Sequence, residues 1–469
     1  MSATADYAAF APRPLPMARA RGLPFAPQRD RNQYADIVWW ILVYFWFLIF
    51  EGALRKWTFA SAANLFLVIR DPIALIIYAK ALTQRVFPFN PGMLLIGLLA
   101  CVGLTIGVFQ IMDDQMNPLV VAYGWRCYFL QLPMIFIIPR VLTFPDLQKL
   151  GRWILILAIP MTVLMSFQFW LPQGHWLNAS AIEGRYQISA GVGRIRPPGT
   201  FSFITGPSSY YPWVIAFLFA AMTWRKAYPG WLRVAAAVSA VLVLPISGSR
   251  SMMVSYLLVL LLAATGLHRS EQIRRQMIFL LLVAVVAIPV FSVTPLFKAG
   301  VEVFQERWEA AAAAEDTEGR SAVVGMSRRT YGDLTGFIDA MPDTPPIGLG
   351  IGVGTNVGAT LMQNRATFQL AEAEWPRTVQ EMGPVMGTAM ILMRISLTVY
   401  LFVTAWRSFR QDDNTLAWLL FAACGPIMLY GGTGQPTNLG FMVFGAGLCL
   451  AAARNPTPVF QANQDQPWL

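Results

Sequence analysis

Two arginine-containing segments between apolar runs have the residues best suited to bind an anion. Arg194 and Arg196 are two residues apart, and the proline after Arg196 favours an extended backbone, so both side chains are expected to project side by side. Paired guanidinium groups suit a phosphate or a pyrophosphate. Arg250 lies in the tight turn Ser247–Ser251 at the predicted membrane boundary, where an ionisable side chain usually faces a polar cavity. Contact with lipid headgroups is the alternative for these arginines.

Glu372 and Glu374 are the candidate general bases, because they precede the next apolar run and lie near arginines in the sequence. Pairing with Arg365 or Arg377 is the alternative role for either glutamate, and both of these arginines are candidate substrate-binding residues. No Asp-x-Asp pattern occurs in a predicted outer loop, and two glutamates offer fewer oxygens than a hard divalent cation takes. We therefore expect a site that uses neither a metal nor a cofactor.

The composition places these residues in a membrane protein. The chain has 469 residues, of which 56% are apolar and 13% are charged, whereas soluble chains carry about 25% charged residues. The apolar runs do not alternate, which excludes a β-barrel and predicts an all-α polytopic protein. The net charge of +10 is distributed between the runs, so we expect no nucleic-acid partner. The four cysteines stand alone in apolar runs and are expected to be buried.

About twelve apolar runs are long enough to be transmembrane helices. The sequence predicts a disordered basic cytoplasmic tail over 1–35, helices 1–9 within 36–295, a long periplasmic loop over 296–378, helices 10–12 within 379–453 and a cytoplasmic tail over 454–469. No cleavable signal peptide is visible, so the first helix is expected to be retained. The predicted spans are 36–53, 62–81, 92–112, 118–139, 150–170, 200–223, 231–246, 250–267, 276–295, 379–404, 415–430 and 435–453.

The distribution of positive charge supports this count and orients the chain with its N-terminus in the cytoplasm. Each gap assigned to the cytoplasm is basic, as the positive-inside rule requires. The outer gaps 113–117 and 431–434 contain no Lys or Arg. The cytoplasmic charges are Lys80 and Arg85; Arg140, Lys149 and Arg152; Arg225, Lys226 and Arg233; Arg269, Arg274 and Arg275; Arg407 and Arg410; and Arg454. Arg194, Arg196 and Arg250 are exceptions to this pattern, which strengthens the case for an anionic ligand on the outer side.

The long loop has two amphipathic stretches and a glycine-rich stretch. Val301, Phe304 and Trp308 form an apolar stripe that predicts a helix lying on the membrane. Leu334, Phe337, Ile338 and Met341 form a second stripe. The alternating glycines of Pro345–Gly354 lie outside any βαβ unit, so they indicate a close backbone approach and not a dinucleotide site.

Charged residues inside the apolar runs must face protein or water. Structural pairing is the expected role for these residues, and Glu51 and Arg55 have the i, i+4 spacing of an ion pair. The others are Arg70, Asp71, Arg126 and Arg394.

Several short motifs over about 190–390 resemble the O-antigen ligase and O-antigen polymerase superfamily of bacterial inner-membrane glycosyltransferases. Arg196–Phe201 resembles its arginine–glycine–phenylalanine signature, Ser247–Arg250 its serine-rich turn ending in arginine, and Pro346–Gly350 its glycine-rich stretch. Glu372 with Glu381-Met382-Gly383 is similar to the pattern that follows the loop. Phe50–Trp57 also resembles a feature of some polysaccharide-polymerase-like members.

Two departures favour a polymerase or exopolysaccharide enzyme over a lipopolysaccharide ligase. Glu372 stands where the ligase branch has histidine, and Ala373 stands where asparagine is usual. The resemblance implies a GT-C glycosyltransferase, with an undecaprenyl-pyrophosphate-linked glycan as donor and a glycan as acceptor. In that scheme Arg194, Arg196 and Arg250 hold the pyrophosphate, and Glu372 or Glu374 is the base.

Two other classes of protein remain open at this stage. A transporter or flippase would also have twelve spans and intramembrane arginines, but it usually has two similar halves and a midplane site. A non-catalytic subunit that works with other polysaccharide assembly proteins is the third reading.

Overall fold

The computed structural model describes residues 33–113, 116–181, 186–191, 193–224, 226–267, 271–316, 322–362, 370–371 and 373–455. The chain divides into two units, Met1–Ala35 and Asp36–Leu469, and the helix bundle belongs to the second. Most of the two predicted tails lies outside the described residues. Arg365 and Glu372, two of the predicted site residues, also lie outside them.

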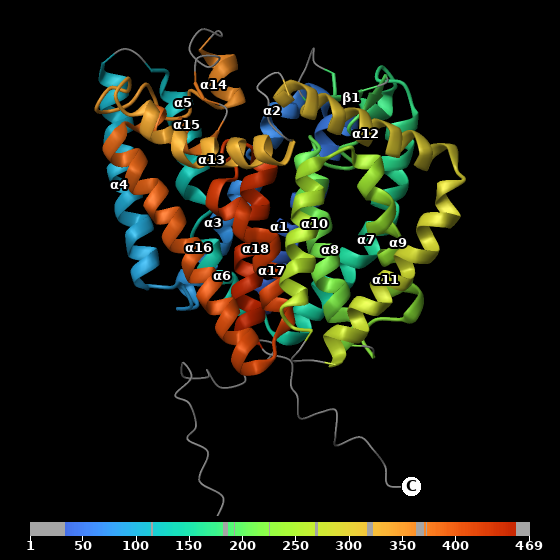
Figure 1. Cartoon of the computed structure of the whole chain (residues 1–469). Coiled ribbons are helices and arrows are strands. Elements are labelled where there is room, and N and C mark those ends of the chain that lie inside the picture. The colour runs from blue at the N-terminus through green and yellow to red at the C-terminus, as the bar shows by residue number, and fades with distance from the viewer. Residues whose placement is uncertain are drawn as a thin grey trace, which may run out of the picture. The chain divides into compact units, whose positions relative to one another are not determined.

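The bundle consists of helices joined mostly by short turns (Figure 1). One two-stranded antiparallel sheet, of β1 (Ser189–Gly191) and β2 (Arg194–Ile195), lies between α7 and α8 in the sequence. The helices are α1 (Ala35–Ala53), η1 (Leu54–Thr58), η2 (Ala60–Ala62), α2 (Ala63–Phe66), α3 (Arg70–Thr83), α4 (Pro91–Met112), α5 (Pro118–Trp125), η3 (Arg126–Leu130), α6 (Met134–Val141), α7 (Phe144–Trp170), η4 (Trp176–Asn178), α8 (Thr205–Thr223), α9 (Gly230–Ser247), α10 (Arg250–Ala264), α11 (Glu271–Ser292), α12 (Pro295–Asp316), α13 (Ala322–Ala340), α14 (Asn356–Leu361), α15 (Glu374–Met382), α16 (Pro384–Asp412), α17 (Thr415–Tyr430) and α18 (Pro436–Arg454).

The helical, membrane-embedded architecture predicted from the sequence is confirmed. Among the described residues, eight helical segments are long and apolar enough to cross a membrane, and each coincides with a predicted span. Two further predicted spans correspond to the shorter apolar helices α10 and α17. The remaining two correspond to α3 and α8, which are in neither group. The full count of twelve spans therefore stays a prediction.

Helix α8 lies at the centre of the bundle, which explains why it does not have the composition of a lipid-facing span. Every residue from Gly206 to Met222 is buried. Its Trp213 ring lies against Phe441 of α18 at 4.7 Å between ring centroids. Because such a helix contacts protein on all sides, it can carry serines and tyrosines that bond to its neighbours. The Tyr211 hydroxyl, for example, lies 2.6 Å from the hydroxyl of Thr162 on α7.

The buried charges of α1 and α3 are paired, as the sequence analysis expected. Arg70 is fully buried and donates from Nε to Glu51 at 2.9 Å. Glu51 also lies 3.8 Å from Arg55. Arg126 of η3 pairs with Asp71. These ion pairs allow charged residues to lie inside a largely apolar bundle.

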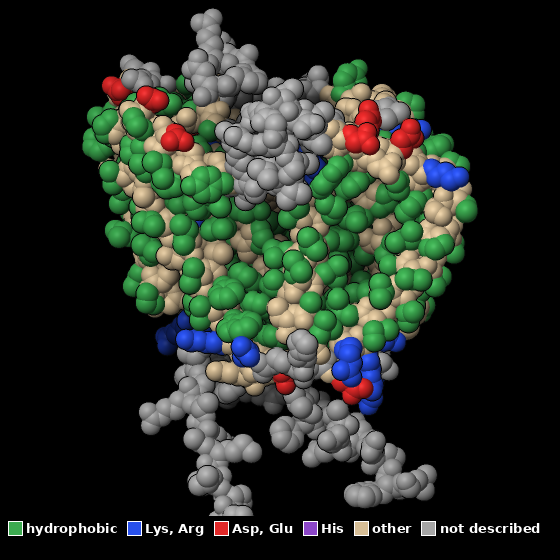
Figure 2. All heavy atoms as spheres, in the orientation of Figure 1, with side chains coloured by type: hydrophobic (Ala, Val, Ile, Leu, Met, Phe, Trp, Pro, Cys, Tyr) green, Lys and Arg blue, Asp and Glu red, His purple; other side chains and the backbone are tan. Residues whose placement is uncertain are grey.

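Helices α12 and α13 lie across one end of the bundle, over the ends of the long helices (Figure 1). The first predicted stripe falls in α12, and the second falls in α13 except for Met341, which follows the end of that helix. Leu334 and Phe337 of α13 pack against a buried cluster that includes Trp375 of α15. In Figure 2, Lys and Arg side chains gather at the opposite rim, and hydrophobic side chains cover the band between the rims.

Two details of the sequence interpretation are corrected. The predicted helix 379–404 is interrupted at Gly383, whose φ of +85° ends α15 before α16 begins at Pro384. Cys127, Cys424 and Cys449 are buried as expected, but Cys101 is exposed on α4. A small thiol on an apolar helix is compatible with a lipid-facing position as well as a buried one.

Candidate functional site: an arginine cluster under helix α12

The turn between α9 and α10 fixes the position of Arg250. Gly248 has φ +53°, a left-handed conformation that glycine adopts without strain, and it ends α9. Ser249 then caps the next helix by accepting a hydrogen bond from the Met252 amide at 3.4 Å. Arg250 is therefore the first residue of α10.

Helix α12 packs directly on this turn and brings a third arginine to it. A Cβ atom at Gly300 would lie 3.2 Å from the Pro245 carbonyl carbon, so the two backbones approach closely. One turn further along α12, a Val303 methyl lies 3.5 Å from the Cβ position of Gly248. Arg307, on the same face of α12, donates a hydrogen bond to the Gly248 carbonyl.

The β1–β2 hairpin completes the site with Arg196. Its Ala190 side chain lies 3.7 Å from the Cβ position of Gly248. The Arg196 amide donates to Ile188 O at 2.9 Å, which continues the strand pairing. The Arg196 Nε is buried and has no hydrogen-bond partner among the described residues.

Arg196 and Arg307 stand on elements that pack against the Gly248 turn, and the three arginines repel one another electrostatically. Burial and the charges of Arg196 and Arg250 lower the pKa of Arg307 to about 10. Burial and the charge of Arg250 also lower the pKa of Arg196. Within the described part of the chain, no carboxylate lies within 4 Å of any of the three. We call Arg196, Arg250 and Arg307 the arginine cluster; its positive charge suits a multiply charged anion.

The segment that carries Arg196 is anchored by the Phe50–Trp57 motif of α1 and η1. A side chain at Gly52 would collide with the backbone of Phe201 and Ser202, so only glycine permits this approach. The Lys56 ammonium donates to Gly199 O at 2.7 Å, and Arg55 Nη1 donates to Ser202 Oγ at 3.0 Å. Two motifs that are about 150 residues apart therefore form one structural unit behind the cluster.

Arg194 has different surroundings from Arg196. Its Nη1 donates to Trp170 O at 2.6 Å, and its guanidinium carbon lies 4.6 Å from the centroid of the Trp170 ring. This contact combines a hydrogen bond with a cation–π interaction. Arg194 is thus held against the end of α7, whereas Arg196 experiences the charge of Arg250.

A second polar region is formed by α15 and its neighbours. Glu374 Oε1 accepts from Arg394 Nη1 at 3.0 Å, and from the amide and hydroxyl of Thr433 at 2.9 and 2.6 Å. Its Oε2 accepts from Arg377. The two oxygens are therefore engaged by four donors. A polar cavity of about 180 Å³ adjoins Glu374 and is lined by Asp333, Ala373, Glu374, Arg377, Tyr430, Gly432, Gln435 and Asn438.

The glycine-rich stretch is held by Glu381, a residue that the sequence analysis did not assign to the site. Glu381 accepts from the Gly352 amide at 3.0 Å and from the Gly354 amide at 2.9 Å. Its burial raises its pKa, which the nearby Arg377 opposes. Gly348, Gly350 and Gly352 have φ values of +79°, +136° and +90°. The predicted close backbone approach is confirmed, because a side chain at Gly352 would collide with Val120 O of α5.

Of the seven predicted site residues, the structure brings Arg196 and Arg250 together and pairs Arg377 with Glu374. It adds Arg307, which shares a helical face with Gly300 and Val303 at i, i+3 and i+7. That spacing is the feature of the sequence that indicates a common face for these three residues. Within the described residues, no group of His, Cys, Asp and Glu side chains could hold a metal ion. No family model matches the chain, and no curated protein matches it significantly.

Proposed function

We propose that the protein is a glycosyltransferase of the bacterial inner membrane that polymerises lipid-linked oligosaccharides on the periplasmic side. The donor is an oligosaccharide on undecaprenyl pyrophosphate, and the acceptor is the sugar end of another lipid-linked repeat unit. The proposal includes a cytoplasmic N-terminus, twelve spans and a GT-C-like arrangement. The observation that carries it is the arginine cluster, which has no carboxylate partner among the described residues and lies where the amphipathic helix α12 crosses one end of a membrane bundle.

The arginine cluster is suited to the leaving group of this reaction. The acceptor hydroxyl oxygen forms the new bond to the anomeric carbon, while the bond from that carbon to the pyrophosphate oxygen breaks. Negative charge then develops on the pyrophosphate, where Arg196, Arg250 and Arg307 stabilise it. A well-placed donor of this kind contributes about 3–4 kcal/mol to the transition state.

The acceptor proton requires a base, and we assign this role to Glu372. Glu374 is less suited because four donors occupy its carboxylate oxygens, so little lone-pair capacity remains for a substrate hydroxyl. Glu372 itself lies outside the described residues, two positions before the start of α15. We assign the polar cavity beside Glu374 to the acceptor, because amide, carboxylate and guanidinium groups are hydrogen-bonding partners for hydroxyl groups.

The test is the length of the glycan made in a deletion strain that carries single variants. Wild type should restore long chains, whereas Arg250→Gln and Glu372→Gln should leave single repeat units on lipid. Arg274→Gln is the matched control, because it removes an exposed guanidinium from the start of α11, on a different element from the cluster. Membrane insertion of each variant is confirmed by immunoblot.

Each outcome is decisive for one part of the proposal. Long chains with Arg250→Gln would remove the arginine cluster from the mechanism, and long chains with Glu372→Gln would remove the base. Long chains in the deletion strain itself would show that another protein polymerises the glycan. Transport or ligation to another acceptor would then become the leading function.

A further inference from the structure

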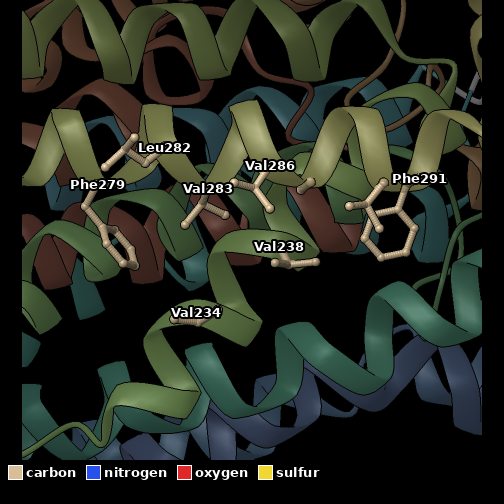
Figure 3. Close-up of a pocket in the computed structure, with 9 residues that line it drawn as sticks. Val234, Val238, Phe279, Leu282, Val283, Val286 and Phe291 are labelled. Carbon is tan, nitrogen blue, oxygen red and sulfur yellow. The ribbon is translucent and has the colours of Figure 1, made fainter.

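A lateral groove lies between α9 and α11, two helices with the length and hydropathy of membrane spans. Its volume is about 350 Å³, and all of its lining residues are apolar. Figure 3 shows Val234 and Val238 of α9 facing Phe279, Val283 and Val286 of α11 across the gap. The lining residues of α11 run from Phe279 to Phe291, a distance of about 18 Å along the helix.

The groove opens towards the hydrocarbon and not towards the protein core. Val234 is 46% exposed and Val286 is 63% exposed. Only 11% of the apolar window of α11 is buried within the protein, the lowest share among the eight candidate spans. The lining positions of α11 recur at helical spacing, so they form one continuous stripe along the helix. An elongated apolar chain can therefore lie along the groove.

Both helices that form the groove continue in the chain into elements that carry the arginine cluster. Helix α11 ends at Ser292, and α12 begins three residues later. Helix α12 then crosses the top of α9, where Gly300 contacts Pro245 and Arg307 donates to Gly248. Helix α9 is thus followed in the chain by α10, which carries Arg250, and α11 is followed by α12, which carries Arg307.

We propose that this groove binds the polyisoprenoid tail of the donor, with the donor's pyrophosphate held by the arginine cluster. This inference rests on the proposed function and adds the site of the lipid tail. Charge complementarity selects the occupant, because three arginines with no carboxylate partner in the described part of the chain match a pyrophosphate better than the single phosphate of a phospholipid. The tail is already in hydrocarbon before it binds, so the groove contributes mainly fit and orientation.

Leu282 and Val286 provide a way to fill the groove, and the same helix supplies a matched control. Leu282 and Val286 line the groove and are 57% and 63% exposed. Leu281 and Val285 do not line it, yet they are 63% and 58% exposed. The double variant Leu282→Trp, Val286→Trp therefore blocks the groove, whereas Leu281→Trp, Val285→Trp adds the same bulk to another face of α11.

The experiment measures equilibrium binding of radiolabelled undecaprenyl pyrophosphate and of inorganic pyrophosphate to the full chain in lipid nanodiscs. The groove-filling variant should bind the lipid about tenfold more weakly than wild type and should bind inorganic pyrophosphate unchanged. The control variant should match wild type with both ligands. Arg250→Gln should weaken the binding of both ligands. Excess phosphatidylglycerol should not displace the bound lipid.

The outcomes separate this inference from the proposed function. Wild-type lipid binding by the groove-filling variant, or equal weakening by both tryptophan pairs, would overturn the groove assignment and leave the cluster in place. Displacement by phosphatidylglycerol would identify an ordinary phospholipid as the occupant and would also overturn it. Unchanged binding of both ligands by Arg250→Gln would instead refute the anion site on which the proposed function depends.

Discussion

Replacement of Arg196 by methionine is expected to stabilise the folded protein and to lower its activity. Arg196 Nε is buried without a hydrogen-bond partner in the described structure, and a buried unsatisfied donor costs about 1–3 kcal/mol. The Arg250 charge adds repulsion, which contributes to the lowered pKa of Arg196. Methionine keeps the unbranched stem and removes both costs. We expect a gain of about 1–2 kcal/mol in the free energy of unfolding.

The gain should appear as a rise of about 1–2 °C in the unfolding temperature, because the unfolding entropy grows with chain length. The assay is thermal unfolding of the purified chain in nanodiscs, followed by tryptophan fluorescence. Inorganic pyrophosphate should raise the unfolding temperature of wild type and should have a smaller effect on Arg196→Met. In the glycan assay, loss of one charge-stabilising donor should lower the rate by about a hundredfold.

Arg194→Met is the control for this prediction, because Arg194 makes contacts that methionine cannot replace. Its loss removes the hydrogen bond to Trp170 O and the cation–π contact with the same residue. Arg194→Met should therefore lower the unfolding temperature. If Arg196→Met is destabilised to a similar extent at the same level of membrane insertion, Arg196 is a structural residue and the reasoning about the cluster is wrong.

Three further predictions follow from other contacts. Glu374→Gln should remove the carboxylate that pairs with Arg377 and Arg394, which should cost about 3–5 kcal/mol of folding free energy. Size-exclusion chromatography should then show little folded protein. A folded but inactive variant would instead support a catalytic role for Glu374. Gly52→Ala should lower the free energy of unfolding by about 1–3 kcal/mol, because the new Cβ atom collides with the neighbouring backbone. Thermal unfolding measures this loss, and a variant as stable as wild type would contradict the close approach. Arg307→Gln should bind pyrophosphate more weakly than wild type at pH 8, and this difference should shrink as the pH rises past about 10, where free Arg307 loses its proton; a difference that stays constant up to pH 11 would contradict the role of this charge.

The sequence was sufficient for features that depend on local pattern. Apolar runs identified the helices, because a segment in hydrocarbon must satisfy its own backbone hydrogen bonds. The near absence of a spacer between two apolar runs identified the turn before Arg250, and the structure shows how Gly248 ends one helix and Ser249 caps the next. The interruption of 379–404 also had a local signal that was missed, because Gly383-Pro384 is a typical helix boundary.

Features that depend on tertiary contact were beyond the sequence. Glu374 was a candidate base because two arginines were near it in the sequence, but Arg394, twenty positions away, also pairs with it. Arg307 was one of several arginines in a long loop, and only the packing of α12 on α9 brings it to Arg250. The helical spacing of Gly300, Val303 and Arg307 indicates that they share a face, but helix propensity and hydropathy carry no information on which other helix that face meets.

The pairing of buried arginines separates those that support the fold from those available for a ligand. Arg70, Arg126 and Arg394 each contact a carboxylate within the bundle. Such pairs offset the cost of removing charge from water. A buried arginine in such a pair is therefore not evidence of a binding site. Arg196 and Arg250 are different, because each has another arginine as its charged neighbour and neither has a carboxylate partner among the described residues. Repulsion of this kind opposes folding, and the anionic donor that we propose would neutralise it.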